Sequence, residues 1–216
     1  MNKEQIMIHR INHHTITEKP DEVAVEQSIC ILLGNGEKVH VTCSPSHMEE
    51  MILGRRFLEG DVSLEELPAS VSEANALKEV GLKEIFGIAK GFFENPGSLF
   101  VDTGCAHSCA LIYQGKVVCH IEDIGRHNAL DKVIGYALLH QIPIKGAYIF
   151  SSGRISGDYL EKVIAAGFFM VVSRAAVTGN AVALAKEKNI TMLGFIREHK
   201  GNLYHEGAVK ICNDIE

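Results

Sequence analysis

Strand-length apolar segments alternate with helix-length segments through the second half of the chain, and this alternation restricts the fold more than any other feature. The predicted strands cover residues 99–102, 110–113, 117–121, 147–150, 168–172 and 191–195. Helical patterns separate several of them, over residues 128–140, 156–166 and 179–188. Strands joined by crossover helices form a layered sheet, so residues 99–216 are predicted to be an α/β core whose strand-end loops form the ligand-binding face.

The first half of the chain predicts a smaller N-terminal subdomain, which begins after a polar leader at residues 1–21. Two alternating segments, residues 22–33 and 38–42, flank an Asn35-Gly36 turn. An Asn-Gly pair between alternating segments is typical of a β-hairpin, which we therefore expect here.

Helical signals follow the predicted hairpin. Ser46 and Glu49 have the spacing of a capping box, which predicts a helix over residues 47–58. Residues 63–95 carry helix-like apolar spacing and are interpreted as a helical insert. Together with the hairpin, these segments define a predicted subdomain of residues 22–98.

Charge and hydropathy argue against two classes of partner. With a formal net charge of -6, the chain has no general basic surface, and it is not expected to bind nucleic acid. No apolar run reaches the roughly 18 residues that span a bilayer, and the polar N-terminus does not resemble a secretory signal, so a cytoplasmic protein without membrane contact is expected. Its six cysteines are then expected to be thiols rather than disulfides.

Residues 103–109 hold the densest group of reactive side chains, namely Cys105, His107 and Cys109 beside a glycine-containing turn. Cysteine is nucleophilic as the thiolate, which backbone N–H groups and a nearby protonated histidine stabilise. Cys105 and His107 are therefore candidates for thiol chemistry. Two alternatives stay open: the cysteines as buried neighbours on one helical face, and a metal site of all three residues, whose close spacing is unusual for zinc.

A second candidate site lies in residues 122–132, where the sequence leaves a predicted strand, turns at a glycine and enters a helix. N–H groups at a helix start bind anions, and Arg126 and His127 add charge there. Asn128 is a candidate for the same site or for the cap of the helix. The alternative is an exposed loop in which Asp123 and Arg126 pair in solvent.

Further loops repeat this pattern at the ends of other predicted strands. Ser152 and Arg154 lie in a loop of small residues ahead of a predicted helix, as in a phosphate-binding turn. Residues 174–178 and 197–200 follow the next strands and begin with an arginine. Loops at neighbouring strand ends share one edge of a sheet, so together they predict a pocket for a large ligand that carries phosphates.

These motifs also carry a family resemblance. The chain resembles the FdhD/NarQ family in Thr103-Gly104-x-x-His107, in the run from Glu122 to Lys132, in Ser152-Gly153-Arg154 and in Leu193-Gly194-Phe195. The first half agrees through Asn35-Gly36, Ser44-Pro45 and Leu58-Glu59-Gly60. The resemblance therefore spans about residues 22–205.

The resemblance implies a cytidine-deaminase-like fold, a layered mixed sheet with flanking helices, and a role in making formate dehydrogenase active. Members of the family take sulfur as a persulfide from a cysteine desulfurase and pass it to a molybdenum or tungsten cofactor that carries two guanine dinucleotides. The family segment that binds this cofactor corresponds to Phe195, Ile196, Arg197, Glu198, His199 and Lys200. The resemblance implies no catalytic metal, and a homodimer suits a cofactor with two nucleotide halves.

The chain departs from the family at the cysteines. The persulfide cysteine of the family lies in a Cys-x-x-Cys loop ahead of the Thr-Gly-x-x-His motif, whereas residues 44–104 here contain no cysteine. A carrier of sulfane sulfur has to be a thiolate, so either Cys105 or Cys109 takes this role or the protein transfers no sulfur. Three functions follow: a sulfurtransferase with Cys105 as the favoured carrier, a non-catalytic cofactor chaperone, or a metal-dependent deaminase-like hydrolase.

Overall fold

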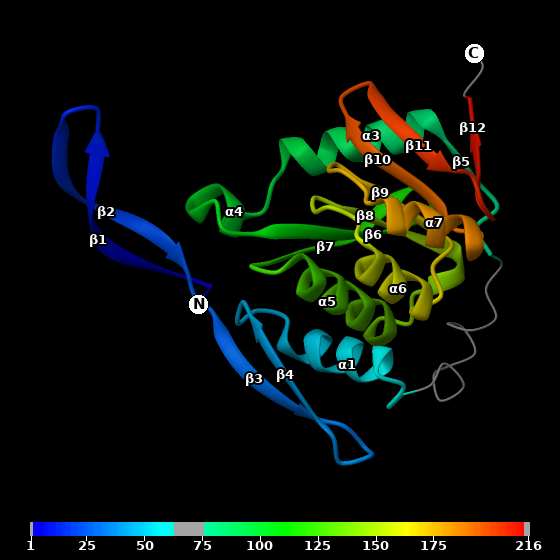
Figure 1. The fold of residues 1–216 in the computed structure, drawn as a ribbon, viewed down its shortest axis with the longest axis horizontal. Coiled ribbons are helices and arrows are strands. Elements are labelled where there is room, and N and C mark those ends of the chain that lie inside the picture. Colours follow the sequence, from blue (N-terminus) through cyan, green and yellow to red (C-terminus); the bar gives the residue numbers. More distant parts are fainter. Residues whose placement is uncertain (1, 63–75, 214–216) are drawn as a thin grey trace.

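The protein is a mixed α/β structure built on a six-stranded sheet (Figure 1). The computed structural model describes residues 2–62 and 76–213. In the sheet order β11-β10-β9-β8-β6-β7, the bounds are Lys200–His205, Thr191–Arg197, Met170–Ser173, Ala147–Ser151, His107–Tyr113 and Lys116–Asp123. Strands β8, β9 and β10 are parallel, and the other pairings are antiparallel. The predicted α/β core with a mixed sheet is confirmed, while the cytidine-deaminase-like fold stays a prediction.

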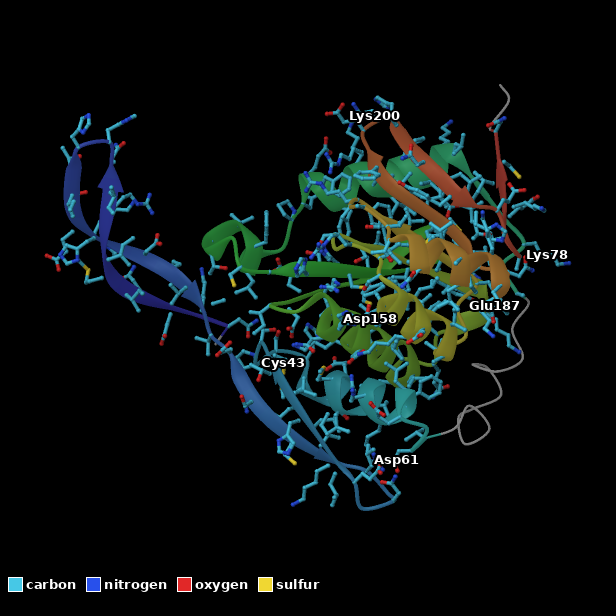
Figure 2. All side chains as sticks on the ribbon, viewed as in Figure 1. Cys43, Asp61, Lys78, Asp158, Glu187 and Lys200 are labelled. Carbon is cyan, nitrogen blue, oxygen red and sulfur yellow. The ribbon has the colours of Figure 1, made fainter. Side chains whose placement is uncertain are left out.

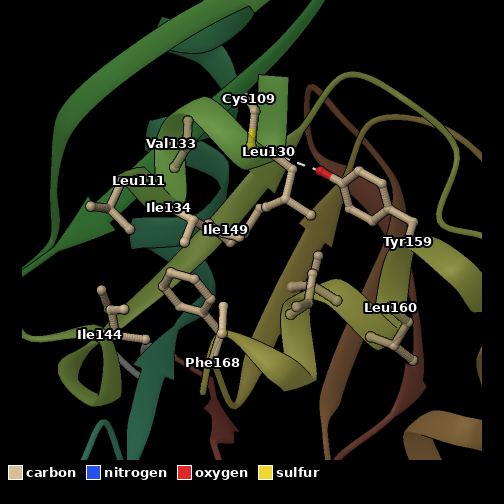
Figure 3. Close-up of a cluster of buried hydrophobic side chains, with 14 of the residues drawn as sticks. Cys109, Leu111, Leu130, Val133, Ile134, Ile144, Ile149, Tyr159, Leu160 and Phe168 are labelled. Carbon is tan, nitrogen blue, oxygen red and sulfur yellow. Dashed lines mark hydrogen bonds between the residues drawn. The ribbon is translucent and has the colours of Figure 1, made fainter. Parts of the chain in front are cut away.

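Helices cover both faces of this sheet. They are α1 (Met48–Leu58), α3 (Leu82–Glu94), α4 (Ser98–Thr103), α5 (Arg126–Leu139), α6 (Gly157–Ala165) and α7 (Gly179–Glu187), with a 3-10 turn η2 (Ile144–Gly146) before β8. Neighbouring strand residues point to opposite faces. Leu111 therefore packs with Leu130 of α5 in one buried cluster (Figure 3), while Ile112 packs with Ile85 of α3 in the other.

The first predicted strand of the core, residues 99–102, is wrong, because this segment belongs to helix α4. The Glu122 carboxylate accepts hydrogen bonds from the N–H groups of Leu99 and Phe100 at 2.9 and 3.0 Å. A Cβ atom on Gly97 would lie 2.0 Å from this carboxylate, so glycine is required at the helix start. A four-residue apolar run fits either a strand or a helix, and here a side chain of β7 supplies acceptors for the first turn of a helix.

Residues 27–58 contain the predicted hairpin and helix. Strands β3 (Gln27–Leu32) and β4 (Lys38–Cys43) confirm the hairpin, and α1 confirms the helix. The capping box is wrong: His47 is the N-cap residue, in a left-handed conformation with φ of 53°, and no side chain caps the helix. Instead, His47 Nδ1 lies 3.1 Å from Glu50 Oε1, and Ser46 stays outside the helix.

Helix α1 packs closely against α5. A Cβ atom on Gly54 would lie 1.9 Å from the carbonyl oxygen of Asp131, and one on Gly135 would lie 1.8 Å from the carbonyl oxygen of Glu50. The two helix backbones therefore approach at a distance that only glycine permits at both positions.

The residues predicted as a polar leader form most of a long hairpin that projects from the body (Figure 1). Strands β1 (Lys3–Asn12) and β2 (Thr15–Ala24) pair antiparallel over their full length, and we call residues 3–24 the arm. Lys3 forms an ion pair with Asp102 of α4 at its base. The prediction missed the arm because its charged residues obscure the alternation that marks a strand.

The remaining described strands form a separate two-stranded sheet. Strands β5 (Glu79–Gly81) and β12 (Lys210–Cys212) form a small parallel pair. Helix α3 confirms the helical prediction for residues 82–94, but the prediction is wrong for residues 79–81, which form β5. Residues 63–75 of that predicted insert lie outside the described residues. Among residues 2–62 and 76–213, no helix has the length and hydropathy needed to cross a membrane.

Candidate functional site

A cavity of about 640 Å³ lies where several strands and α4 end. Its volume is in the range of pockets that hold one small organic ligand. Its walls are formed by Phe92, Phe93, Pro96, Phe100, Gly104, Cys105, Ala106, His107, Ser108, Ile124, Ser152, Arg174, Ala175 and Arg197. The cavity therefore combines a thiol, an imidazole, two guanidinium groups and several aromatic rings.

Cys105 is the exposed thiol of this cavity. Gly104 ends helix α4 in the left-handed conformation, with φ of 66°, which glycine adopts without strain. The N–H group of Cys105 then donates to Thr103 Oγ1 at 3.0 Å. This tight turn directs the chain out of α4 and into β6, which places Cys105 at the surface between them.

His107 lies at the start of β6 and is partly buried in the cavity wall. Burial lowers the pKa of its imidazole below the ordinary value of 6.5, and the positive charges of Arg126 and Arg154 lower it further. The imidazole is therefore held neutral at neutral pH and is available to accept a proton.

Cys109 lies apart from the cavity, fully buried among core side chains (Figure 3). Its sulfur contacts the hydroxyl of Tyr159 at 3.8 Å, and burial raises the pKa of this thiol far above its ordinary value. The helical-face alternative is wrong for the pair, because Cys109 lies in β6 and Cys105 in the loop before it. Within the described ranges, no three His, Cys, Asp or Glu side chains group as metal ligands, so Cys105, His107 and Cys109 do not form a metal site.

Arg126 and His107 both lie close to Gly153, in the loop after β8. A Cβ atom on Gly153 would lie 3.0 Å from Arg126 Cβ and 3.5 Å from His107 Nδ1, so a glycine permits this contact. Arg126 donates to Ser156 Oγ at 3.3 Å, while its buried Nε has no hydrogen-bond partner among the described residues. Ser152 Oγ accepts from the Ser108 N–H group at 2.8 Å. Arg126, predicted as a cofactor-binding residue, is therefore not among the residues that line the cavity, and its unpaired Nε is buried.

Arg174 and Arg197 line the cavity at the ends of β9 and β10. The guanidinium of Arg174 lies 4.6 Å from the centre of the Phe93 ring, a cation–π contact. Arg197 Nε donates to the carbonyl oxygen of Arg174 at 3.3 Å. The candidate site residues from the sequence did not include Phe93, Pro96 or Phe100, although aromatic residues on both sides of Pro96-Gly97 in a charged segment were a usable signal.

Most of the 122–132 segment has a structural role. The carboxylate of Asp123 and the ammonium of Lys132 are both fully buried and 2.6 Å apart. Ser44 joins them, since its N–H group donates to Asp123 at 3.0 Å and its carbonyl oxygen accepts from Lys132 at 2.8 Å. The alternative of a solvent-exposed pair between Asp123 and Arg126 is therefore wrong.

The other predicted residues of this segment also turn away from the cavity. Asn128 donates to the carbonyl oxygen of Thr42 at 2.7 Å and to Asp123 at 3.0 Å, whereas Gly125 is the N-cap residue of α5. His127 Nε2 lies 3.3 Å from the Asp158 carboxylate at the start of α6. Burial lowers the pKa of His127, and the charges of Lys162 and Arg126 lower it further.

The β10–β11 turn places its residues in different surroundings. Phe195 is exposed, but Ile196 is buried in the core, so Ile196 cannot contact a ligand. Phe195, Arg197 and Lys200 line a second, smaller cavity of about 190 Å³, and Figure 2 shows Lys200 at this turn. Glu198 has a left-handed φ of 48°, and the His199 ring lies 6.5 Å from that of Phe86.

The fold and the cavity define a class of protein: an α/β protein with an exposed thiol inside a cavity lined by two arginines. The model of the FdhD/NarQ family matches residues 59–210. A sulfur carrier protein FdhD of Bacillus pumilus is 30% identical over 94% of this chain and 95% of its own length. The protein FdhD of Methanocaldococcus jannaschii is 31% identical over 95% of this chain and 97% of its own.

A solved structure has the same fold. The crystal structure of a putative formate dehydrogenase accessory protein from Desulfotalea psychrophila aligns with a TM-score of 0.83 and 24% identity, covering 95% of this chain and 97% of that one. With the family match over most of its length, the chain belongs to the FdhD/NarQ family.

Proposed function

We propose that this protein is an accessory factor for formate dehydrogenase maturation, which binds a molybdenum or tungsten bis-guanine-dinucleotide cofactor and carries sulfur to it on Cys105. The observation that supports this proposal is that the exposed thiol of Cys105 lines the same cavity as Arg174 and Arg197. Relatives named as sulfur carrier proteins and a solved structure named as a putative formate dehydrogenase accessory protein support this proposal.

The residues of the cavity fit a ligand with phosphates and planar bases. Arg174 and Arg197 would hold phosphate oxygens. The exposed ring of Phe100 offers a face on which a guanine can stack. A volume of about 640 Å³ suits one nucleotide portion of the cofactor rather than both. When bound, the cofactor would supply the metal centre that takes up the sulfur.

Cys105 would receive sulfur by thiol exchange. Its thiolate attacks the outer sulfur of a persulfide on a cysteine desulfurase, the sulfur–sulfur bond of the donor breaks, and the desulfurase cysteine leaves as a thiolate. The persulfide is then carried on Cys105 with no net oxidation. The neutral imidazole of His107, in the same cavity wall, can accept the proton that Cys105 loses.

Persulfide loading tests this assignment. After incubation with a cysteine desulfurase and cysteine, mass spectrometry of the intact protein should show one added sulfur atom, and peptide mapping should place it on Cys105. The Cys105→Ala variant should lose this mass gain. Cys30→Ala is the matched control, because Cys30 is also exposed but lies in β3, and it should load normally. Loading that persists in Cys105→Ala would reject Cys105 as the carrier.

A second function, a cofactor chaperone without sulfur transfer, is favoured by the lack of any cysteine in residues 44–104. Both functions require nucleotide binding, which calorimetry with GDP measures directly. Arg174→Met should weaken GDP binding by about tenfold or more, as expected for a lost charged hydrogen bond, whereas the exposed Lys188→Met should not. GDP binding without persulfide on any cysteine would establish the chaperone, and absence of both would reject the two functions together.

A further inference from the structure

The backbone of Cys105 is held by the side chain of Thr103. The Cys105 N–H group donates to Thr103 Oγ1 at 3.0 Å, and the same hydroxyl donates to the carbonyl oxygen of Leu99 at 2.6 Å. A hydroxyl can accept one hydrogen bond while it donates another. Thr103 therefore links the residue that carries the thiol to the first turn of α4.

The hydrogen bonds continue from Leu99 to a carboxylate. The carbonyl group of Leu99 and the N–H group of Phe100 belong to one peptide unit, and this N–H group donates to Glu122 Oε1 at 3.0 Å. The N–H group of Leu99 donates to Glu122 Oε2 at 2.9 Å. These hydrogen bonds form one connected set, which we call the α4 series. Every donor in it points from the Cys105 amide toward the Glu122 carboxylate.

The α4 series is stronger than its separate bonds. Each hydrogen bond polarises the next one, and a bond that ends on an ionised carboxylate is stronger than a neutral one. The peptide unit at its centre is shielded from water, since Leu99 is only 3% exposed. Glu122 lies in β7, opposite Ser108 of β6. The sheet therefore fixes one end of the series, and Cys105 lies at the other.

Two residues of the α4 series line the cavity. Phe100 and Cys105 belong to its wall, whereas Thr103 and Glu122 are not among the residues that line it. We propose that Thr103 and Glu122 are positioning residues, which fix the backbone of Cys105 and Phe100 so that the thiol meets its sulfur donor in one orientation. Their role rests on the proposed function of Cys105 as a sulfur carrier. It would explain why the Thr-Gly-x-x-His motif and the segment that begins at Glu122 occur together.

Hydrogen exchange tests whether the α4 series exists in solution. In NMR spectra of the full chain, the Cys105 amide should be protected from exchange although the residue is exposed. Thr103→Val removes the hydroxyl and keeps the shape of the side chain, so exchange at this amide should become about tenfold faster. Thr103→Ser keeps a hydroxyl and should keep most of the protection. An unprotected amide in the wild-type protein would overturn the proposal.

The rate of persulfide loading tests the positioning role. With a cysteine desulfurase and cysteine, Thr103→Val should load Cys105 about tenfold more slowly, and Thr103→Ser should recover most of the rate. Alkylation of Cys105 by iodoacetamide should change far less, because a small reagent can approach from many directions. Equal slowing of alkylation and loading, or a loading rate that Thr103→Val leaves unchanged, would overturn the positioning role.

Thr42→Val is the matched control for Thr103→Val. The Thr42 hydroxyl also has a hydroxyl partner, Ser28 Oγ at 3.1 Å, but it lies in β4 and outside the α4 series. The substitution removes the same chemical group, so loading of Cys105 should keep the wild-type rate. Slowing equal to that of Thr103→Val would overturn the proposal, because the loss would then not depend on the α4 series.

A double variant tests whether Glu122 and Thr103 act together. Glu122→Gln removes the charge and one of the two acceptor oxygens, so it should also slow loading. If both residues act through one series, the double variant should be little slower than the slower single variant, whereas independent effects would multiply and overturn the shared series. Circular dichroism checks the folding of each variant, and the two Thr103 variants decide the matter if Glu122→Gln does not fold. If wild-type Cys105 took up no sulfur, the proposed function would fail, while the exchange rates would still support or overturn the α4 series.

Discussion

His107 shows how neighbouring residues set the chemistry of a single side chain. Its pKa is lowered by burial and by the charges of Arg126 and Arg154. Arg126→Met removes one of these positive charges, so the pKa of His107 should rise toward 6.5. An NMR titration of the imidazole C–H signals measures this change directly.

The control for the His107 titration is Arg10→Met, in the arm and far from the core in sequence, which should leave the His107 signal unchanged. Arg154→Met should act in the same direction as Arg126→Met but less strongly, since the charge of Arg154 contributes less. A His107 pKa that falls or stays constant in Arg126→Met would contradict the electrostatic explanation. Binding of GDP should raise the same pKa, because phosphates favour the protonated imidazole.

Residue type alone could not separate the two candidate cysteines. Cys105 and Cys109 lie in one short motif, yet one is exposed in the cavity and the other is buried beside Tyr159. The difference arises because helix α4 is capped at Gly104 and β6 begins at His107. The short turn between these residues carries Cys105 at the surface, and Cys109 follows inside the sheet. A sequence pattern that predicted a strand at residues 99–102 could not locate this turn.

At the scale of elements, the segment from β7 into α5 depends on its buried ion pair. Lys132→Met would leave the Asp123 carboxylate buried without its cation, and this should lower the free energy of unfolding by roughly 3–5 kcal/mol. Urea denaturation followed by circular dichroism measures the change. Lys188→Met removes an exposed lysine and should cost less than about 0.5 kcal/mol. Equal effects of the two substitutions would show that the buried pair has no special role.

The contact between α1 and α5 makes a second prediction about elements. Gly135→Ala places a methyl group against the backbone of Glu50, so the helices must separate and stability should fall by about 1–3 kcal/mol. Gly91→Ala, in α3 with open space around it, should instead raise stability by about 0.4–1 kcal/mol. Thermal unfolding of the two variants gives this comparison, and a stable Gly135→Ala protein would argue against the close helix contact.

Elements with a long, regular pattern could be predicted from the sequence, and those decided by distant side chains could not. The β3–β4 hairpin and α5 follow from a turn motif and from apolar spacing. Helix α4 depends on the Glu122 carboxylate from another element, which local propensity does not reveal. The same limit applies to the site: arginines at strand ends were predicted, whereas Phe93 reaches the cavity because α3 covers one face of the sheet.

At the scale of the whole molecule, partly buried histidines make stability depend on pH. Burial is the main cause that lowers the pKa of His107, His120 and His127 below 6.5. Below that pH the unfolded chain binds more protons at these sites than the folded protein does, so the histidine contribution to stability should be fully present well above pH 6.5 and be lost as the pH drops below it. Urea midpoints at about pH 8 and about pH 5.5 test this dependence.

A variant identifies the histidine contribution to this dependence. His120 packs against Phe92, with ring centres 4.7 Å apart, so His120→Leu keeps an apolar contact and removes a titrating group. The fall in stability between the two pH values should become smaller in this variant. An unchanged fall would assign the pH dependence to other groups.

The cation–π contact between Arg174 and Phe93 has a consequence for the speed of ligand exchange. An arginine side chain normally loses rotamer freedom when it binds an anion, but the Phe93 ring already restricts the rotamers of Arg174. An anion that arrives in the cavity therefore meets a guanidinium fixed in place, so less free energy is lost to ordering and the residence time of the ligand lengthens. Phe93→Leu would keep the charge of Arg174 but remove the ring that restricts its rotamers. The variant should therefore release the ligand faster.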